Sequence, residues 1–311
     1  MTGGWSRRRL VVALASLWAS GCAARSAPSV PAAPPSKLDP PRVIPSELAV
    51  VLRFDLDRLR SGPSALASGA RAALGSDSSG GTDAVRRALE RADTLWLGFR
   101  PGEAVLMADA VWVLRGDFAG FLSGAEWGSA SDLGTGWELY ERRPDLRSDP
   151  GRLYRRLDEL CVFVSEAAYD SVERVLEQGA ADPTTLLAPS YGLASARARA
   201  PALVDALAHR ARAAADLLRR AVEISGVIDV RGGFWSASVA LDFRHERDAE
   251  KTARAVELLA RALTEQDARV RPLLSRLHVE VVEATARAEL RVAEETLLAL
   301  IRCWGSEACA G

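Results

Sequence analysis

The sequence predicts an α+β protein made of two related halves, each an antiparallel sheet with helices on one face. Short β-branched segments alternate with amphipathic helical segments, and two strands in the second half form a clear hairpin. A break of small and polar residues at 179–185 separates the halves, which we place at 44–180 and 186–311. A chain of 311 residues has room for one large domain or two ordinary ones.

The N-terminal half should contain several strands, because six segments are rich in β-branched and aromatic residues. These strands are expected at 48–55, 94–100, 109–115, 137–142, 152–157 and 161–165. Helices are expected from Asp57, at 82–91 and at 169–177, and Gly179 suits the position that ends the last of them.

In the C-terminal half, the clearest signal is a hairpin with a two-glycine turn at Gly232 and Gly233, joining strands 227–231 and 234–243. Alternation within the second strand points its apolar residues to one face, which is expected to be the core face. Those residues are Trp235, Ala237, Val239, Leu241 and Phe243. The remaining elements are strands at 190–198, 278–282 and 285–292, and helices at 202–224, 248–264 and 294–302. The order from the hairpin onward is therefore β-β-α-β-β-α.

One dipeptide, Asp-Phe, occurs at a similar place in both halves. Asp117-Phe118 and Asp242-Phe243 each end a strand and precede an expected helix. This favours a duplicated unit, although one dipeptide also recurs by chance.

The first residues have the pattern of a secretory signal. Arg7, Arg8 and Arg9 precede a short apolar run at 10–18, which small residues separate from Cys22. The run is too short to span a bilayer as a helix, which takes about 20 residues. The alternatives are a twin-arginine signal or an ordinary basic start, and the second is favoured in a chain so rich in arginine.

The residues before Cys22 resemble the bacterial lipobox. Ser20, Gly21 and Cys22 match it, while Ala19 replaces the preferred leucine. The resemblance implies cleavage after residue 21 and a diacylglyceryl and acyl (palmitate-type) anchor on Cys22. The competing interpretation is an ordinary signal peptide followed by a chance cysteine.

Residues 22–43 are rich in proline and poor in large apolar residues, so we expect a disordered tether. Ala23, rather than aspartate, follows Cys22, which by analogy with the best-known sorting rule favours the outer membrane, facing the periplasm. Together with the α+β alternation, these features are similar to lipobox-containing envelope lipoproteins of high-GC Gram-negative bacteria with ferredoxin-like α+β repeats. That resemblance supplies no active-site residues.

Composition and cysteines set further bounds. Lysine and arginine number 40 against 41 acidic residues, so the charge does not favour a nucleic-acid partner. Cys161 lies in an apolar run and is expected to be a buried hydrophobe. Cys303 and Cys309 are expected to pair in an oxidising periplasm.

No catalytic set is recognised. The three histidines, His209, His245 and His278, lack metal-ligand spacing, so no metal and no cofactor are expected. The best carboxylate pair is Asp55 and Asp57, for which capping of the following helix by Asp57 is favoured over cation binding or acid–base work.

Tryptophans offer one candidate binding surface. Trp96, Trp112 and Trp235 lie on expected strands and should be core residues. Trp127 and Trp137 flank a glycine- and serine-rich loop, where an exposed pair would suit a glycan or an envelope protein, although packing of the loop is the commoner outcome.

Three functions follow from these features. The leading hypothesis is a non-enzymatic envelope lipoprotein that binds or scaffolds another envelope component, held to the membrane at Cys22. The alternatives are a carrier of lipid or another apolar ligand and an enzyme with an unfamiliar site. A cavity or apolar surface would favour the carrier, and a cleft with several titratable groups would favour the enzyme.

Overall fold

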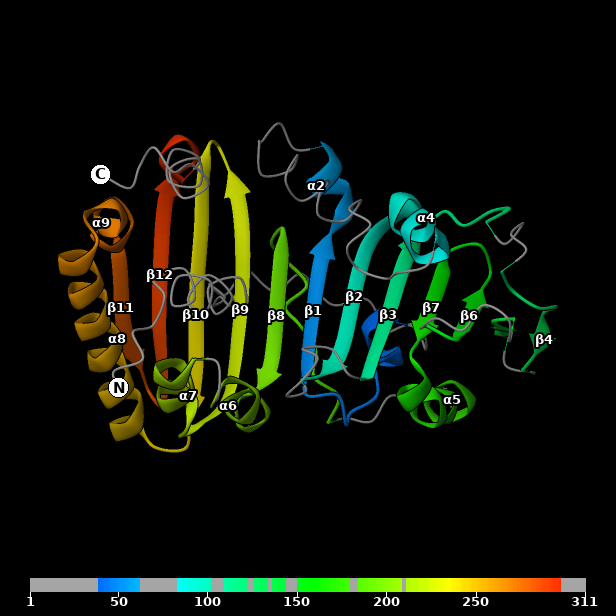
Figure 1. Ribbon diagram of the computed structural model, residues 1–311, viewed down its shortest axis with the longest axis horizontal. Helices are drawn as coiled ribbons and strands as arrows, with labels where there is room; N and C mark the ends of the chain where they lie inside the picture. Colours follow the sequence, from blue (N-terminus) through cyan, green and yellow to red (C-terminus); the bar gives the residue numbers. More distant parts are fainter. Residues whose placement is uncertain are drawn as a thin grey trace, which may run out of the picture. The chain divides into compact units, whose positions relative to one another are not determined.

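The computed structural model describes residues 39–61, 83–101, 109–121, 126–133, 136–143, 150–178, 184–208 and 211–297. The chain divides between Ala188 and Pro189 into two compact units, which we call the N-terminal unit and the C-terminal unit. Both combine helices with an antiparallel sheet (Figure 1), so the predicted α+β class is confirmed.

The sheet of the N-terminal unit has the strand order β1-β2-β3-β7-β6-β5-β4. Its strands are β1 (Val50–Asp55), β2 (Ala92–Arg100), β3 (Asp109–Gly116), β4 (Ser131–Asp132), β5 (Glu138–Glu141), β6 (Arg152–Arg156) and β7 (Leu160–Val164). The helices are η1 (Pro40–Val43), α2 (Leu56–Ser61), α4 (Asp83–Arg91), η3 (Glu166–Ala168) and α5 (Tyr169–Gln178).

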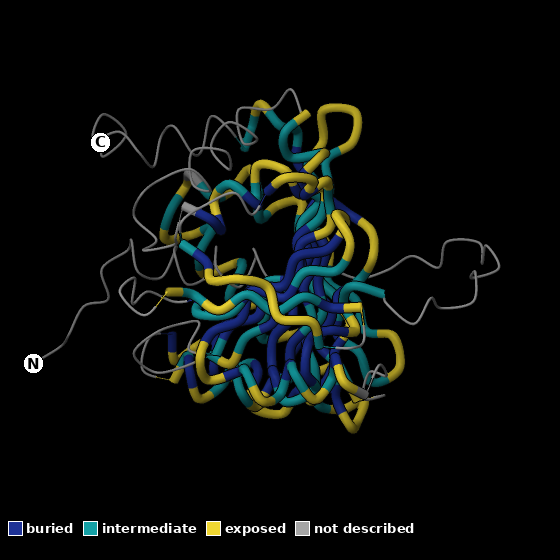
Figure 2. Tube along the Cα trace, turned by 90° about the vertical axis from the view of Figure 1, so that its right-hand side faces the viewer, coloured by how far each residue is buried: buried dark blue, intermediate teal, exposed yellow. Residues whose placement is uncertain are grey.

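Both faces of this sheet are covered, which corrects the prediction of helices on one face. Every residue of β7 is buried, so its alternating side chains must enter two cores. Val162 and Val164 join a cluster that contains Val172 and Leu176 of α5, whereas Cys161 and Phe163 join a second cluster with Ala84 and Ala88 of α4. Figure 2 views this unit end on and shows buried residues inside, with exposed residues mainly at turns.

The folded chain begins before the end of the expected tether. Pro40–Val43 form a short 3-10 helix, and Val43 is buried with Ile44 and Leu48 in the first cluster. Gly98 of β2 makes this possible, because a Cβ atom there would lie 2.4 Å from Ile44 Cγ2. These few apolar residues are therefore sufficient to dock a segment that its proline content marks as a linker.

The C-terminal unit has the strand order β11-β12-β10-β9-β8. Its strands are β8 (Ala194–Arg199), β9 (Ala221–Arg231), β10 (Phe234–Phe243), β11 (Leu277–Val282) and β12 (Thr285–Ala293). Its helices are α6 (Ala200–Ala208), α7 (Arg212–Leu218), α8 (Glu246–Gln266), η4 (Ala268–Val270) and α9 (Arg271–Leu274). The hairpin β9–β10 forms as predicted, and Gly232 and Gly233 both have positive φ, at 57° and 76°.

The long helix expected at 202–224 is wrong. The chain forms two short helices, α6 and α7, and enters β9 at Ala221. Leu218 and Val222 fit a helical stripe in sequence, but Leu218 is buried while Val222 is 45% exposed. Pairing of Ile224 with Leu241 on β10 and with Ala198 on β8 stabilises the strand over the helix.

The last predicted helix and the surroundings of the repeated Asp-Phe dipeptide are described in part. Residues 294–297 are helical, and the rest of 294–302 lies outside the described residues. Asp242 and Phe243 precede α8, whereas Phe118 is followed by a turn that ends the described stretch at Phe121. Phe118 and Phe243 are both buried.

Candidate functional site

Several predicted site residues lie outside the described part of the chain. These are Cys22, the cysteines Cys303 and Cys309, and His209. The lipid anchor and the disulfide therefore stay predictions. Within the described residues, no helix is both long and apolar enough to cross a membrane.

Trp127 and Trp137 are both buried, so they do not form the exposed pair that would suit a glycan or protein partner. Trp127 is 5% exposed and packs against Phe163, with ring centroids 6.1 Å apart. Trp137 is 2% exposed and belongs to the other core cluster. Trp127 forms an antiparallel β-bridge with Arg142, and the two indoles belong to different core clusters. The two side chains are packed in the core, which is the outcome that the sequence analysis gave as the commoner one.

The Asp55 and Asp57 carboxylates have structural roles. Asp55 Oδ1 accepts a hydrogen bond from the backbone N–H of Arg58 across 3.0 Å, which caps α2. The prediction had assigned the cap to Asp57, which instead lies in the first turn. The strand ends at Asp55 as predicted, but α2 begins at Leu56, one residue earlier than expected, so the cap moves from the second aspartate to the first.

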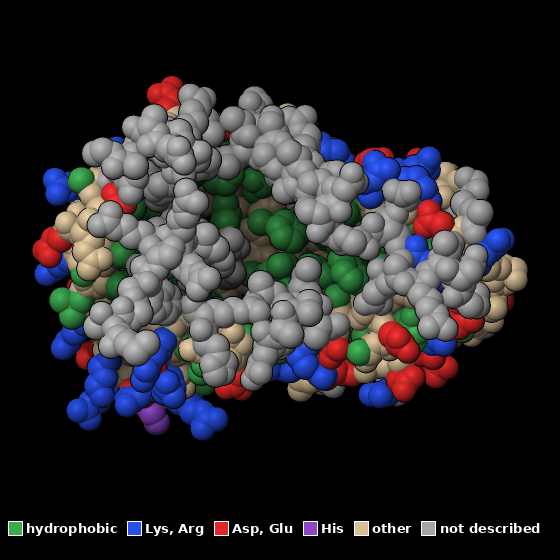
Figure 3. Space-filling model, viewed as in Figure 1, with side chains coloured by type: hydrophobic (Ala, Val, Ile, Leu, Met, Phe, Trp, Pro, Cys, Tyr) green, Lys and Arg blue, Asp and Glu red, His purple; other side chains and the backbone are tan. Residues whose placement is uncertain are grey.

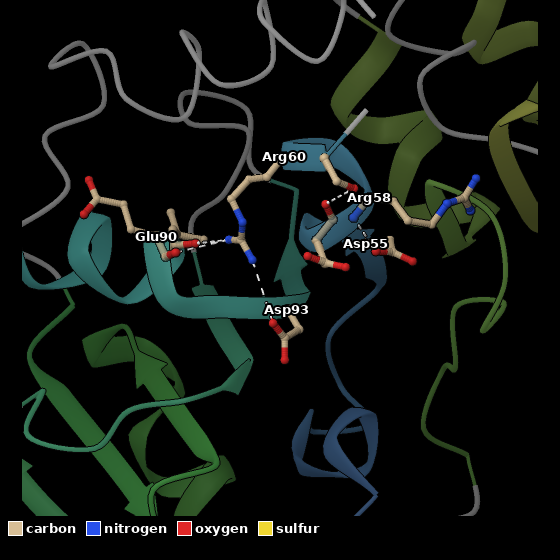
Figure 4. Close-up of polar contacts among 8 residues, drawn as sticks. Asp55, Arg58, Arg60, Glu90 and Asp93 are labelled. Carbon is tan, nitrogen blue, oxygen red and sulfur yellow. Dashed lines mark hydrogen bonds and ion pairs between the residues drawn. The ribbon is translucent and has the colours of Figure 1, made fainter. Parts of the chain in front are cut away.

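Figure 4 shows Arg60 reaching from α2 toward the end of α4. Its guanidinium donates to the carbonyl oxygens of Leu89 (3.1 Å) and Glu90 (3.3 Å), and it lies 3.8 Å from the Asp93 carboxylate. A cation at the C-terminus of a helix satisfies carbonyls that have no partner within the helix. The charged side chains of this region thus secure α2 and α4. Among the described residues, no cluster of three or more aspartate, glutamate, histidine or cysteine side chains could hold a metal ion.

The most buried ionisable groups lie in the N-terminal unit and are also structural. The Tyr154 hydroxyl donates to Glu173, which also accepts from Arg152 across 2.7 Å. Burial and the bond to Glu173 raise the pKa of the Tyr154 phenol. Burial raises the pKa of the Cys161 thiol to about 12, as suits a small hydrophobe.

The described histidines sit apart. His245 occupies the N-cap position of α8 without a side-chain capping bond, and His278 opens β11, 3.9 Å from Glu280 and 70% exposed. The two histidines belong to different elements, and neither is part of a cluster of possible metal ligands among the described residues. Among the candidate residues that the structure describes, the histidines and the cysteine lie apart and do not form a common site.

The C-terminal sheet has one face built wholly from apolar residues and glycine. The cross-strand register places Trp235, Ala237, Val239 and Leu241 of β10 on this face. Their partners on the neighbouring strands are equally apolar. They are Ile224, Gly226, Ile228 and Val230 of β9, Ala286, Ala288, Leu290 and Val292 of β12, Leu277, Val279 and Val281 of β11, and Ala194, Ala196 and Ala198 of β8. We call this set the apolar face.

The opposite face is mostly polar, although Val227 and Ala240 on it are buried. It carries ion pairs between Arg197 and Glu223 and between Arg287 and Glu280. Thr285 also donates to Asp242 across 2.7 Å. The two faces therefore differ sharply in the ligands that they could bind.

Burial varies along the apolar face. At one end Ile224, Leu241 and Ala286 are at most 7% exposed, near the start of α8, whose buried residues are Ala249, Thr252 and Ala253. At the other end Val292 is buried, but several of the larger side chains are only partly buried. They include Trp235, Ile228, Val230, Leu277 and Leu290. Figure 3 shows hydrophobic side chains over β8 and β9 in this view.

The sequence does not by itself identify this face as a site. The alternation within β10 predicts a core face, and this prediction is correct near Leu241 and Phe243, which are buried. The signal in the sequence is that β8, β9, β11 and β12 alternate in the same way as β10, so that five strands share one apolar side. Of the three tryptophans predicted to be core residues, Trp96 is buried at 9% exposure, whereas Trp112 and Trp235 are only partly buried.

No protein-family model and no curated protein matches the sequence. Among solved structures, crystal form I of TP0453 matches with 11% identity and a TM-score of 0.49, over 85% of this chain and 96% of that one. Crystal forms III and IV give 13% and 12% identity, with TM-scores of 0.47 and 0.48 over 85% of this chain.

Proposed function

We propose that the protein is a lipid-anchored, non-enzymatic lipoprotein of the bacterial envelope, and that its C-terminal unit binds the acyl part of a lipid or another apolar ligand. The apolar face carries this proposal. The lipobox-like residues up to Cys22 support the anchor. The leading sequence hypothesis of a binding role and the carrier alternative are thus combined.

The apolar face suits a binding role because it is only partly buried at the end that holds Trp235, Ile228 and Leu290. Soluble proteins rarely leave contiguous large apolar side chains uncovered without a function. Apolar walls with few polar groups are also what ligand sites for apolar molecules require. The roles of Asp55, Glu173 and Cys161 in capping, packing and core formation support a non-enzymatic activity.

Metabolic labelling tests the anchor. Cells that express the full chain are fed radioactive palmitate, and the same is done with Cys22→Ala. We expect label and membrane association in the first and neither in the second. Label that persists in Cys22→Ala would contradict the anchor, as would a wild-type chain that takes up no label.

Ligand binding is tested on the full chain carrying Cys22→Ala, so that the attached lipid cannot occupy the face. Lipids that co-purify are extracted and measured by mass spectrometry. Ala237→Glu places a charge on the apolar face, and Ser236→Glu places the same charge on the exposed face of the same strand. We expect lipid with the parent chain and with Ser236→Glu, and loss of lipid with Ala237→Glu.

Two results would count against the binding proposal. One is equal lipid content in all three proteins, and the other is a parent chain that carries no lipid and binds none when it is added. Circular dichroism checks that each variant is folded. Crosslinking in intact cells tests the scaffolding version, in which a protein rather than a lipid is captured by the C-terminal unit.

A further inference from the structure

Two buried polar atoms stand unpaired at one end of the apolar face. Trp235 Nε1 and Glu294 Oε1 are inaccessible to solvent and have no hydrogen-bond partner in the structure. One is a donor and the other is an acceptor. Buried polar groups nearly always have partners, so such a pair calls for an explanation.

The two residues belong to the same end of the β10–β12 ladder. Trp235 pairs with Val292, and Glu294 lies two residues beyond Val292. The backbone N–H of Glu294 donates to Gly233 across 2.9 Å, which holds Glu294 beside the turn that begins β10. Glu294 is the first residue after β12 and begins a helical turn, so its backbone lies at the same end of the ladder as Trp235.

Burial at this end of the apolar face is mixed. Trp235, Val230 and Leu290 are partly buried, whereas Val292, the cross-strand partner of Trp235, is 2% exposed. From Trp235 to Leu241 the strand rises about 20 Å. The face therefore offers a long apolar surface with two unpaired polar atoms at one end, which is the layout that a single-headed amphiphile requires.

We propose that Trp235 and Glu294 bind the headgroup of a neutral, hydroxyl-bearing amphiphile, such as a monoacylglycerol or a fatty alcohol. This rests on the proposed function and names its ligand class. A hydroxyl can accept from the indole N–H and donate to the carboxylate at the same time. The acyl chain lies along the apolar face toward Leu241.

The same geometry disfavours a free fatty acid. An ionised carboxylate headgroup has no proton to donate to Glu294, and the two negative charges repel strongly where water is excluded. Ligands with the same acyl chain should therefore be distinguished by the headgroup alone.

Isothermal titration calorimetry on the folded full chain with Cys22→Ala tests this, using 1-monoolein and oleate as probes at neutral pH. We expect monoolein to bind at least about tenfold more tightly than oleate, because one good hydrogen bond changes the binding constant by about that factor. Trp235→Phe should weaken monoolein binding about tenfold, because the ring is kept and the donor is lost. Glu294→Gln should strengthen oleate binding and so reduce or reverse the preference.

Matched controls separate the site from the fold. Glu289→Gln changes an exposed carboxylate on the polar face of β12, and Trp96→Phe changes a buried indole of the N-terminal unit. Both should keep the wild-type preference. If Trp235→Phe does not fold, the shift in preference with Glu294→Gln decides the matter alone.

The outcomes distinguish this inference from the proposed function. Equal binding of both probes, unchanged by Glu294→Gln and Trp235→Phe, would overturn the headgroup site and leave an apolar binding face. Failure of both probes to bind would overturn the binding face and the headgroup site together. A preference for monoolein that only these two variants change supports both.

Discussion

The Tyr154 hydroxyl donates a hydrogen bond to Oε1 of Glu173 across 2.9 Å and so joins β6 to α5. The same oxygen accepts from Arg152 across 2.7 Å, and the Arg152 guanidinium lies 4.3 Å from the centre of the Tyr169 ring. Tyr154 is fully buried while Glu173 keeps part of its side chain in solvent. This contact positions α5 over its core cluster.

Tyr154→Phe should lower the free energy of unfolding by about 1 kcal/mol, because one buried hydrogen bond is lost while the ring stays in place. Urea unfolding followed by circular dichroism measures the change. Tyr140→Phe is the matched control, since the Tyr140 hydroxyl donates to Glu138 across the same 2.9 Å from a half-buried position. An equal loss in both variants would contradict the role given to burial.

Gly116→Ala should be one of the most damaging small substitutions. A Cβ atom there would lie 2.3 Å from the Arg91 carbonyl oxygen and 2.7 Å from Ala92 Cα, and backbone atoms cannot move aside as a side chain can. We expect a loss of about 2–3 kcal/mol in the free energy of unfolding. Gly128→Ala, whose nearest neighbour would be 3.4 Å away, should cost much less, and a similar cost in both would disprove the close approach.

Hydrophobic periodicity predicts most of the fold. The wrong prediction of one long helix at 202–224 has a physical cause. Ala214 and Leu218 have helical spacing and are buried in α7. Ile224 and Ile228 continue an apolar pattern that is equally compatible with a strand, and cross-strand partners on β8 and β10 decide for the strand. Those partners are distant in sequence, so no local window contains the information.

The candidate site was harder to predict for a related reason. Trp235 and Glu294 are separated by the whole of α8 and β11 in sequence, and only the register of β10 with β12 brings them to one end. Trp127 and Trp137 look paired in sequence but belong to different core clusters. Local composition indicates apolar residues, whereas long-range pairing decides which face they share.

Asp55→Ala should destabilise the protein more than Asp57→Ala. The first removes the acceptor of the Arg58 N–H and should cost about 1 kcal/mol. The second removes a favourable charge from the first turn of α2 and should cost about 0.3–0.5 kcal/mol. Asp55→Asn keeps a capping oxygen and should lie between Asp55→Ala and the parent chain. Urea unfolding ranks the three variants, and the reverse order would restore Asp57 as the cap.

Cys161 should be inert in the folded protein. Burial raises the pKa of its thiol from the ordinary 9.0 to about 12, and the thiolate is the reactive species. Iodoacetamide at pH 8, followed by peptide mapping, should modify Cys161 far more slowly in the folded chain than in urea. Comparable rates in both states would show that the thiol is accessible.

The same shift makes stability depend on pH. The unfolded thiol loses its proton near pH 9.0, while the folded thiol keeps its proton until about pH 12. The contribution is therefore complete below pH 9 and is lost as the pH rises from there, at about 1.4 kcal/mol per pH unit. Tyrosines also titrate in this range, so the test compares the parent chain with Cys161→Ala across pH 8 to 10.5. The difference in unfolding free energy between them should shrink as the pH rises, and a constant difference would mean that the folded thiol ionises as freely as the unfolded one.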